Sequence, residues 1–122
     1  MSKKVIMIGW HPSVVDYSKF PGLTEDKLSS ALIADKNKLI EQGYDASWVY
    51  LYKSDSAVED LSKLLKENTY DVIMIGAGVR KVDEHFLLFE KLINVIHELA
   101  PKSKIAFNTG PTDSDSAIKR WA

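Results

Sequence analysis

Four short apolar segments predict four β-strands. Residues 5–8 and 72–75 are continuous apolar runs between a charged residue and a glycine, the pattern of a strand that is covered on both faces. Residues 105–107 form a weaker run of the same kind. In residues 46–52, aromatic side chains alternate with aliphatic ones. This alternation favours a strand at the edge of the sheet.

Between these segments, apolar residues recur at helical spacing. Thr24 is a suitable N-cap for a helix over residues 25–42, and Ser56 with Glu59 forms a capping-box pattern for a shorter one. A third helix with a wide apolar face is expected from Asp83 until Pro101 stops it.

A last helix is expected to begin at Asp113 or Ser114, so strands and helices alternate along the whole chain. This order predicts an α/β fold in a single domain over residues 1–122: a doubly wound, three-layer structure around a four-stranded parallel sheet. The strand order 2-1-3-4 is the most economical, because it places the two most apolar strands in the centre. Ligands in such sheets bind beyond the carboxyl ends of the strands, here between the first and third strands.

At the level of the fold, the chain resembles the Rossmann-like and flavodoxin-like superfamilies. The dinucleotide fingerprint of the former requires Gly-x-Gly-x-x-Gly after the first strand, whereas here Gly76 and Gly78 follow the third and Lys81 replaces the last glycine. The sequence Trp-His-Pro at 10–12 also lacks the Ser/Thr/Gly-rich loop that holds FMN in flavodoxins. We therefore expect neither NAD nor FMN, and no cofactor is predicted.

Composition excludes several classes of function. The 122 residues carry 16 Lys and Arg against 17 Asp and Glu, a net charge of -1, so no strong field favours nucleic acid or a membrane surface as partner. No cysteine is present, and the three histidines show no metal-ligand spacing, so no metal site is expected. No targeting segment is visible, and a cytoplasmic location is the expectation.

The segment after the first strand is a candidate lid. It runs from Gly9 to the helix at Thr24, longer than most strand-to-helix connections, and Trp10 and Tyr17 are suited to exclude water from a ligand. His11 is a candidate general acid or base. The alternative is that the aromatic residues only cap the end of the core.

The loop after the third strand is a candidate anion site. Gly76 and Gly78 would let the backbone approach a carboxylate or phosphate, and Arg80 would clamp it. His85, at the following helix start, is a second candidate catalytic residue. The alternative is that the glycines relieve crowding and Arg80 pairs with a nearby aspartate.

The loop after the fourth strand adds Asn108 and Thr109 as candidate ligand-binding residues. Asn, Thr, Gly, Pro and Asp also suit an ordinary turn and helix cap. Three hypotheses follow from these loops. The first is binding, with or without chemistry, of a compact anionic metabolite. The second is a non-catalytic domain that works as a homodimer or with a protein partner. The third is a phosphocarrier using His11, which lies directly after the first strand, where the similar IIB components of sugar phosphotransferase systems have their phosphoacceptor, a cysteine.

Overall fold

The computed structural model describes residues 2–122, which form one four-stranded sheet. The strands are β1 (Lys4–Trp10), β2 (Asp45–Leu51), β3 (Val72–Ile75) and β4 (Lys104–Phe107). All neighbouring strands are parallel and their order is β2-β1-β3-β4. The predicted fold class and strand order are therefore confirmed.

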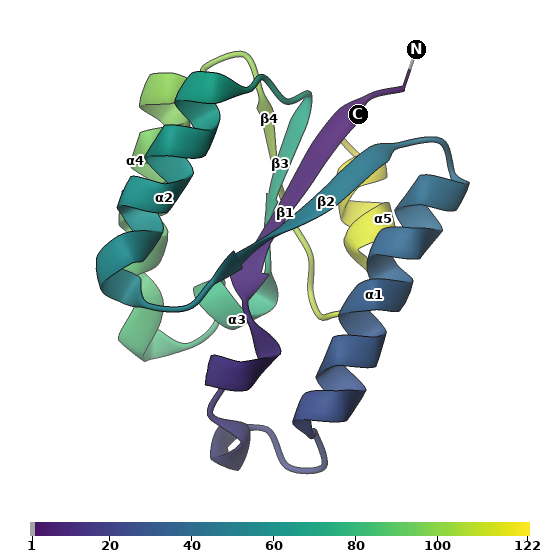
Figure 1. Cartoon of the computed structure of the whole chain (residues 1–122), viewed down its shortest axis with the longest axis vertical. Coiled ribbons are helices and arrows are strands. Elements are labelled where there is room, and N and C mark those ends of the chain that lie inside the picture. The colour runs from purple at the N-terminus through teal and green to yellow at the C-terminus, as the bar shows by residue number, and fades with distance from the viewer. Residues whose placement is uncertain (1) are drawn as a thin grey trace.

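Helices cover both faces of the sheet (Figure 1). α1 (Glu25–Glu41) and α5 (Ser114–Lys119) pack on one face, and α2 (Ser54–Glu67) and α4 (Phe86–Leu99) pack on the other. α2 and α4 also contact each other. This contact explains the wide apolar face of α4, which covers the sheet and a neighbouring helix together. No helix within residues 2–122 is both long and apolar enough to cross a bilayer.

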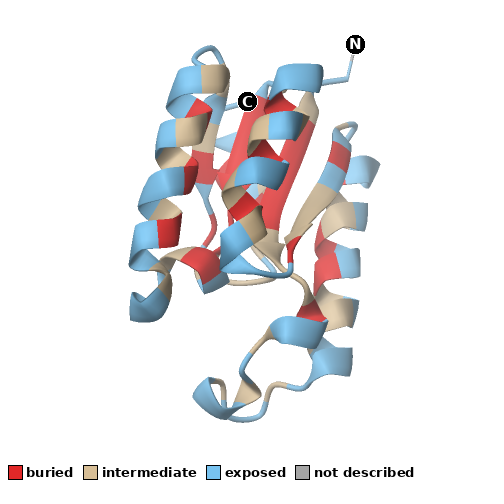
Figure 2. Ribbon diagram, turned by 60° about the vertical axis from the view of Figure 1, so that its left-hand side comes forward, coloured by how far each residue is buried: buried red, intermediate tan, exposed pale blue. Residues whose placement is uncertain are grey.

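The central strands are buried along their whole apolar runs, as Figure 2 shows in red. Side chains on β1 and β3 alternate between two cores: Ile6 and Ile73 face α2 and α4, whereas Met7 and Met74 face α1 and α5. A strand that meets a helix layer on each side has no polar face, which is why its sequence shows no alternation.

Two helix starts differ from the predictions. α2 begins at Ser54 with Lys53 as its N-cap, and the Ser56 hydroxyl donates to the Lys53 carbonyl, so the capping box expected at Ser56 is wrong. The third predicted helix opens as a 3-10 turn, η3 (Asp83–His85), before α4 begins. In addition, the loop after β3 contains a short helix, α3 (Ala77–Arg80), that the sequence pattern did not reveal.

Residues 11–24, which we call the lid, connect β1 to α1. They contain two 3-10 turns, η1 (Pro12–Val14) and η2 (Tyr17–Lys19), capped by the side chains of His11 and Asp16. Hydrogen bonds from Ser18 to the Asp16 carboxylate hold the pKa of this aspartate below its usual range. The lid is therefore locally ordered without belonging to either helix layer.

Candidate functional site

A cavity of about 650 Å³ lies at the carboxyl edge of the sheet, within the size range of small-molecule sites. Each strand contributes at or just beyond its end: Trp10 for β1, Tyr52 for β2, Gly76 for β3 and Asn108 for β4. The lid closes one side of the cavity. The cavity thus occupies the point where connections leave the central strands in opposite directions, which is where α/β sheets bind ligands.

The structure divides the residues singled out from the sequence into two groups. One group lines the cavity: Trp10, Gly76, Gly78, His85, Asn108 and Thr109. The other group, which packs around it, is His11, Tyr17 and Arg80. The interactions of the second group explain its position.

The His11 side chain forms its hydrogen bonds within the lid. Its Nδ1 accepts the backbone N–H of Ser13 at 3.1 Å and lies 2.7 Å from the hydroxyl of that residue. Its ring stacks on Tyr52 at 4.8 Å. The Tyr17 hydroxyl donates to the Pro12 carbonyl at 2.6 Å, and burial raises the pKa of this phenol. Both side chains therefore hold the fold of the lid.

Arg80 holds the loop after β4. Its guanidinium donates to the backbone carbonyl of Asn108 and lies over the Phe107 ring at 5.1 Å. Burial lowers the pKa of this group, and its Nε has no hydrogen-bond partner within residues 2–122. The pairing with a nearby aspartate, which was the alternative interpretation, is not formed among these residues. Arg80 thus faces protein carbonyl and aromatic groups rather than the cavity.

The two glycines after β3 allow close packing. The Gly76 N–H donates to the Ile8 carbonyl at 2.8 Å, and a Cβ at position 76 would lie 3.1 Å from that same oxygen. A Cβ at Gly78 would meet Trp10 Cδ1 at an ordinary 3.9 Å. Gly76 is therefore required by strand packing, whereas a side chain at position 78 would begin in ordinary contact with the Trp10 ring.

Asn108 is a buried link between two loops. Its side-chain oxygen accepts the Ala77 N–H at 2.8 Å, and its amide donates to the Ser114 hydroxyl at 3.0 Å. Beside it, the Asp113 carboxylate accepts the backbone N–H of Thr109 and of Gly110, which stabilises the turn of the alternative interpretation, but the Asp113 side chain makes no capping hydrogen bond to α5. Of these residues, Asn108, Thr109 and Gly110 still line the cavity wall.

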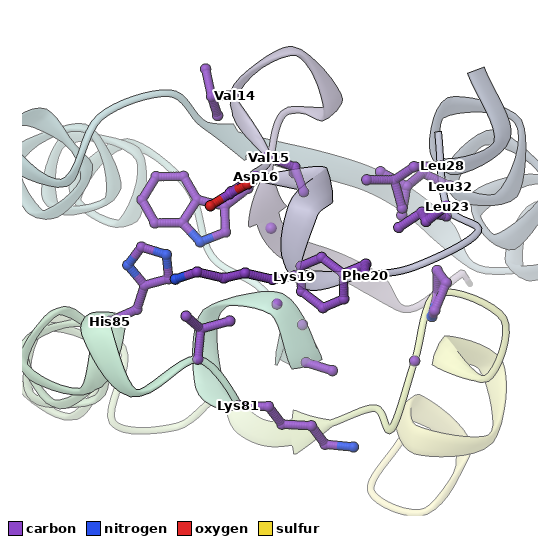
Figure 3. A pocket seen from close by; sticks show the side chains of 18 of the residues that line it. Val14, Val15, Asp16, Lys19, Phe20, Leu23, Leu28, Leu32, Lys81 and His85 are labelled. Carbon is purple, nitrogen blue, oxygen red and sulfur yellow. The ribbon is translucent and has the colours of Figure 1, made fainter. Parts of the chain in front are cut away.

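One end of the cavity is polar. An ion pair joins Lys19 of the lid to Glu84 of η3, raising the pKa of the lysine and lowering that of the glutamate. Figure 3 shows the Lys19 side chain running toward His85. The His85 ring lies 4.7 Å from that of Trp10, whose buried indole N–H has no partner among residues 2–122.

The other end is apolar. Leu28 and Leu32 are one turn apart on α1 and present the same face to the cavity, and Leu23 at the end of the lid lies beside them in Figure 3. Phe20 extends this wall toward the middle. The cavity therefore changes from polar to apolar along its length.

The sequence analysis missed several residues of this region, including Lys19, Glu84 and Asp35. Asp35 is 1% exposed on α1, and neither of its oxygens has a hydrogen bond of normal geometry within residues 2–122. Burial raises the pKa of this carboxyl, and nearby Ser114 offsets only part of the rise. Helical spacing contained the signal, because position 35 lies between Leu32 and Leu39 on the buried face of α1.

Comparisons with known proteins reach the fold alone. No protein-family model matches the chain, and no curated protein matches its sequence. A solved structure of a "putative lipoprotein from Peptoclostridium difficile 630 (fragment)" superposes with a TM-score of 0.52 at 18% identity. The match covers 87% of this chain and 72% of that one. It supports the parallel α/β architecture, and the cytoplasmic location expected from the sequence stays a prediction.

Proposed function

We propose that this protein binds a small organic anion in the cavity at the carboxyl edge of its sheet. The observation that carries the proposal is the cavity itself, which has a volume of about 650 Å³ and takes walls from the ends of all four strands and from the lid. A concave, mainly apolar space with a few polar groups is the usual form of a small-molecule site.

The charges that line the cavity favour an anion. Three lysines contribute to the wall, Lys19, Lys53 and Lys81, against two acids, Asp16 and Glu84. The cation that was expected from the sequence, Arg80, is turned to the Asn108 carbonyl. Lys81 also donates to a backbone carbonyl, that of Thr109, at 2.9 Å, so Lys19 and Lys53 are the cations assigned to the ligand in the proposal. In this arrangement Trp10 and His85 face the ligand, and His11 and Tyr17 keep the lid in shape.

An amide NMR titration with pooled sugar phosphates, nucleotides and small carboxylic acids tests the proposal. We expect shifts at cavity amides such as Gly9, Ala77 and Thr109, and none at Thr69 or Lys102 on the opposite edge of the sheet. The proposal is wrong if no pool shifts the cavity amides, or if the shifts lie at the opposite edge.

A blocking variant makes the test specific to the cavity. Gly78→Leu keeps an ordinary backbone conformation and directs a larger side chain into the space beside Trp10, so it should abolish the shifts. Ala34→Leu is the matched control, because Ala34 is exposed on α1 outside the cavity wall. Equal loss of binding in both variants would contradict the assignment of the site.

Exposed apolar residues favour association with a partner chain as a second candidate function. Phe86 is 59% and Leu87 66% exposed at the start of α4, and the outer edge of β2 pairs with no strand within residues 2–122. Sedimentation velocity at micromolar concentration is the test. A dimer that Leu87→Ser dissociates would support association, and a monomer at all concentrations would contradict self-association.

A further inference from the structure

We infer that the ligand of this cavity is an organic acid with an extended apolar body. Its carboxylate would bind at the Lys19 end, and its body would lie along Leu23, Leu28 and Leu32. This inference rests on the proposed function and names the class of anion. It follows from the separation of polar and apolar residues along the cavity, from the small excess of positive charge and from the apolar rim.

The polar end holds hydrogen-bond donors from two residues of the cavity wall, Lys19 and Trp10. The Lys19 ammonium has three donors, and Glu84 is its ion-pair partner. The Trp10 indole N–H is buried and has no partner within residues 2–122, a state that costs stability unless an acceptor binds there. Of the nearby acceptors, Asp16 Oδ1 already takes two hydrogen bonds from Ser18. A carboxylate, which only accepts hydrogen bonds, would complete this end.

The amount of charge favours a carboxylate over a phosphate ester. The lysines of the wall exceed the acids by one, and both Asp16 and Glu84 have lowered pKa values, so both are charged at neutral pH. Such a site neutralises a single negative charge. A phosphate monoester carries close to two charges at this pH and would place the second beside two carboxylates.

The apolar end disfavours sugars and nucleotides. Leu32 is 7% exposed, and Leu28 and Leu23 are half-buried around the same space. Hydroxyl groups placed there would lose water and gain no hydrogen-bond partner, which is unfavourable, whereas methylene groups would gain from leaving water. The body of the ligand is therefore apolar.

Several exposed residues at the rim of the cavity are also apolar or aromatic. Val14 and Tyr52 both line the cavity and are exposed, by 43% and 54%. Phe86 and Leu87, also exposed, directly follow His85 of the cavity wall. These residues flank the end of the cavity that holds His85, and exposed apolar residues at a rim favour a ligand with apolar surface.

A homologous series of straight-chain carboxylates tests this inference on the unaltered protein. Calorimetric titration from butanoate to decanoate should give a dissociation constant that falls about fourfold per added methylene group. Primary alcohols of equal length should bind at least about tenfold more weakly, because they lack the charge that Lys19 recognises. A series with no dependence on length, or alcohols equal to acids, would overturn the inference.

Two variants locate the ends of the ligand. Leu28→Ser should flatten the dependence on chain length, whereas Ile33→Ser, at a 53% exposed position on the same helix, should leave it unchanged. Lys19→Met should remove the preference for acids over alcohols, and Lys63→Met on the exposed side of α2 should preserve it. Controls that changed as much as the cavity variants would contradict the assignment of the two ends.

Repeating the amide NMR titration with the carboxylate series separates failure of this inference from failure of the proposed function. If sugar phosphates or nucleotides shift the cavity amides and the carboxylate series does not, the cavity binds anions but the ligand class is wrong. If neither group shifts them, the proposed function and the inference are both wrong.

Discussion

The two edges of the sheet differ in how completely their polar groups are paired. At the amino edge, the Asp71 carboxylate accepts the Lys4 N–H at 2.8 Å, and the Ser103 hydroxyl donates to the Tyr70 carbonyl at 2.7 Å. At the carboxyl edge, Trp10 and Arg80 each keep a buried N–H without a partner within residues 2–122. The amino edge also has a cavity, of about 560 Å³, but the polar groups named here pair with one another, whereas the carboxyl edge retains donors.

Connection length accounts for this difference. At the amino edge, residues 42–44, 68–71 and 100–103 turn directly from a helix into a strand, so their few polar groups pair with one another. At the carboxyl edge, the lid and residues 108–113 are longer and fold partly on themselves. The comparison teaches that short turns pair their own polar groups, whereas the longer connections at the edge of the proposed site leave donors unpaired within residues 2–122.

Asn108 offers the strongest way to break this comparison, because it lies at the carboxyl edge but is fully bonded. Asn108→Ala should lower the free energy of unfolding by about 3 kcal/mol, since it removes two hydrogen bonds and leaves the Ala77 N–H unpaired. Urea denaturation measures the change. Asn94→Ala is the control, because exposed Asn94 bonds only within α4 and should change stability by less than about 0.5 kcal/mol.

An equal, small effect of both asparagine variants would mean that Asn108 is dispensable for folding. Its place in the cavity wall would then be its main role, as the sequence pattern suggested. The two edges would then differ more clearly, because even the hydrogen bonds of Asn108 at the carboxyl edge would not stabilise the fold.

Asp35 tests whether a buried polar group without a hydrogen bond also occurs away from the carboxyl edge of the sheet. Burial raises its pKa in the folded state, so the free energy of unfolding should fall as pH rises from the ordinary aspartate value of about 4 through the raised one. Asp35→Asn removes this dependence and should be more stable at pH 8 by about 1 to 2 kcal/mol, the scale of an unsatisfied buried group. At pH 3 the two proteins should be equally stable.

Thermal unfolding from pH 3 to pH 8 measures this difference, with Asp60→Asn on the exposed face of α2 as the control. A less stable Asp35→Asn protein at pH 8 would mean that the carboxylate has a favourable partner and that its pKa is not raised.

Ser103 tests the contribution of the amino edge to stability. Ser103→Ala removes the bond to the Tyr70 carbonyl and should cost about 1 kcal/mol while leaving ligand binding unchanged. Ser62→Ala is the matched control, because that half-buried hydroxyl bonds only the Val58 carbonyl of its own helix, and alanine compensates by higher helix propensity. Weaker binding in Ser103→Ala would show that the two edges are coupled.

The fold was predictable from the sequence because the central strands carry no polar face. The runs at β1 and β3 identified buried parallel strands, and the order of elements then determined the sheet. Local chain ends were less predictable. Ser56 has the residue type of a helix cap, but β2 ends at Leu51 and the helix begins directly afterwards, at Ser54. Tertiary position overrode the capping pattern.

The position of the cavity was predictable from the sequence, but the residues that line it were less so. Topology brought Trp10, His85 and Asn108 to one cavity, because they lie at or after the ends of strands that finish at the same edge. It did not determine where each side chain points: Arg80 reaches a backbone carbonyl, and Lys19 meets Glu84 across 65 residues of sequence. Such contacts depend on how the connecting segments fold. The periodic pattern of apolar residues does not predict the fold of these segments.

The ion pair between Lys19 and Glu84 gives the smallest and most local prediction, since both side chains are partly or largely exposed and global stability should not change. Glu84→Gln should accelerate hydrogen exchange of the lid amides at Lys19 and Phe20 roughly twofold to fivefold, because it removes the charge that ties the lid to η3. Raising salt should accelerate exchange in the unaltered protein and have little effect in the variant.

The pH dependence of lid exchange tests the same ion pair. Because Lys19 lowers the pKa of Glu84, the ion pair should persist at neutral pH and be lost as pH falls through that lowered value. Glu90→Gln, at an exposed position of α4, should leave lid exchange unchanged, and equal exchange in all three proteins would mean that other contacts hold the lid closed.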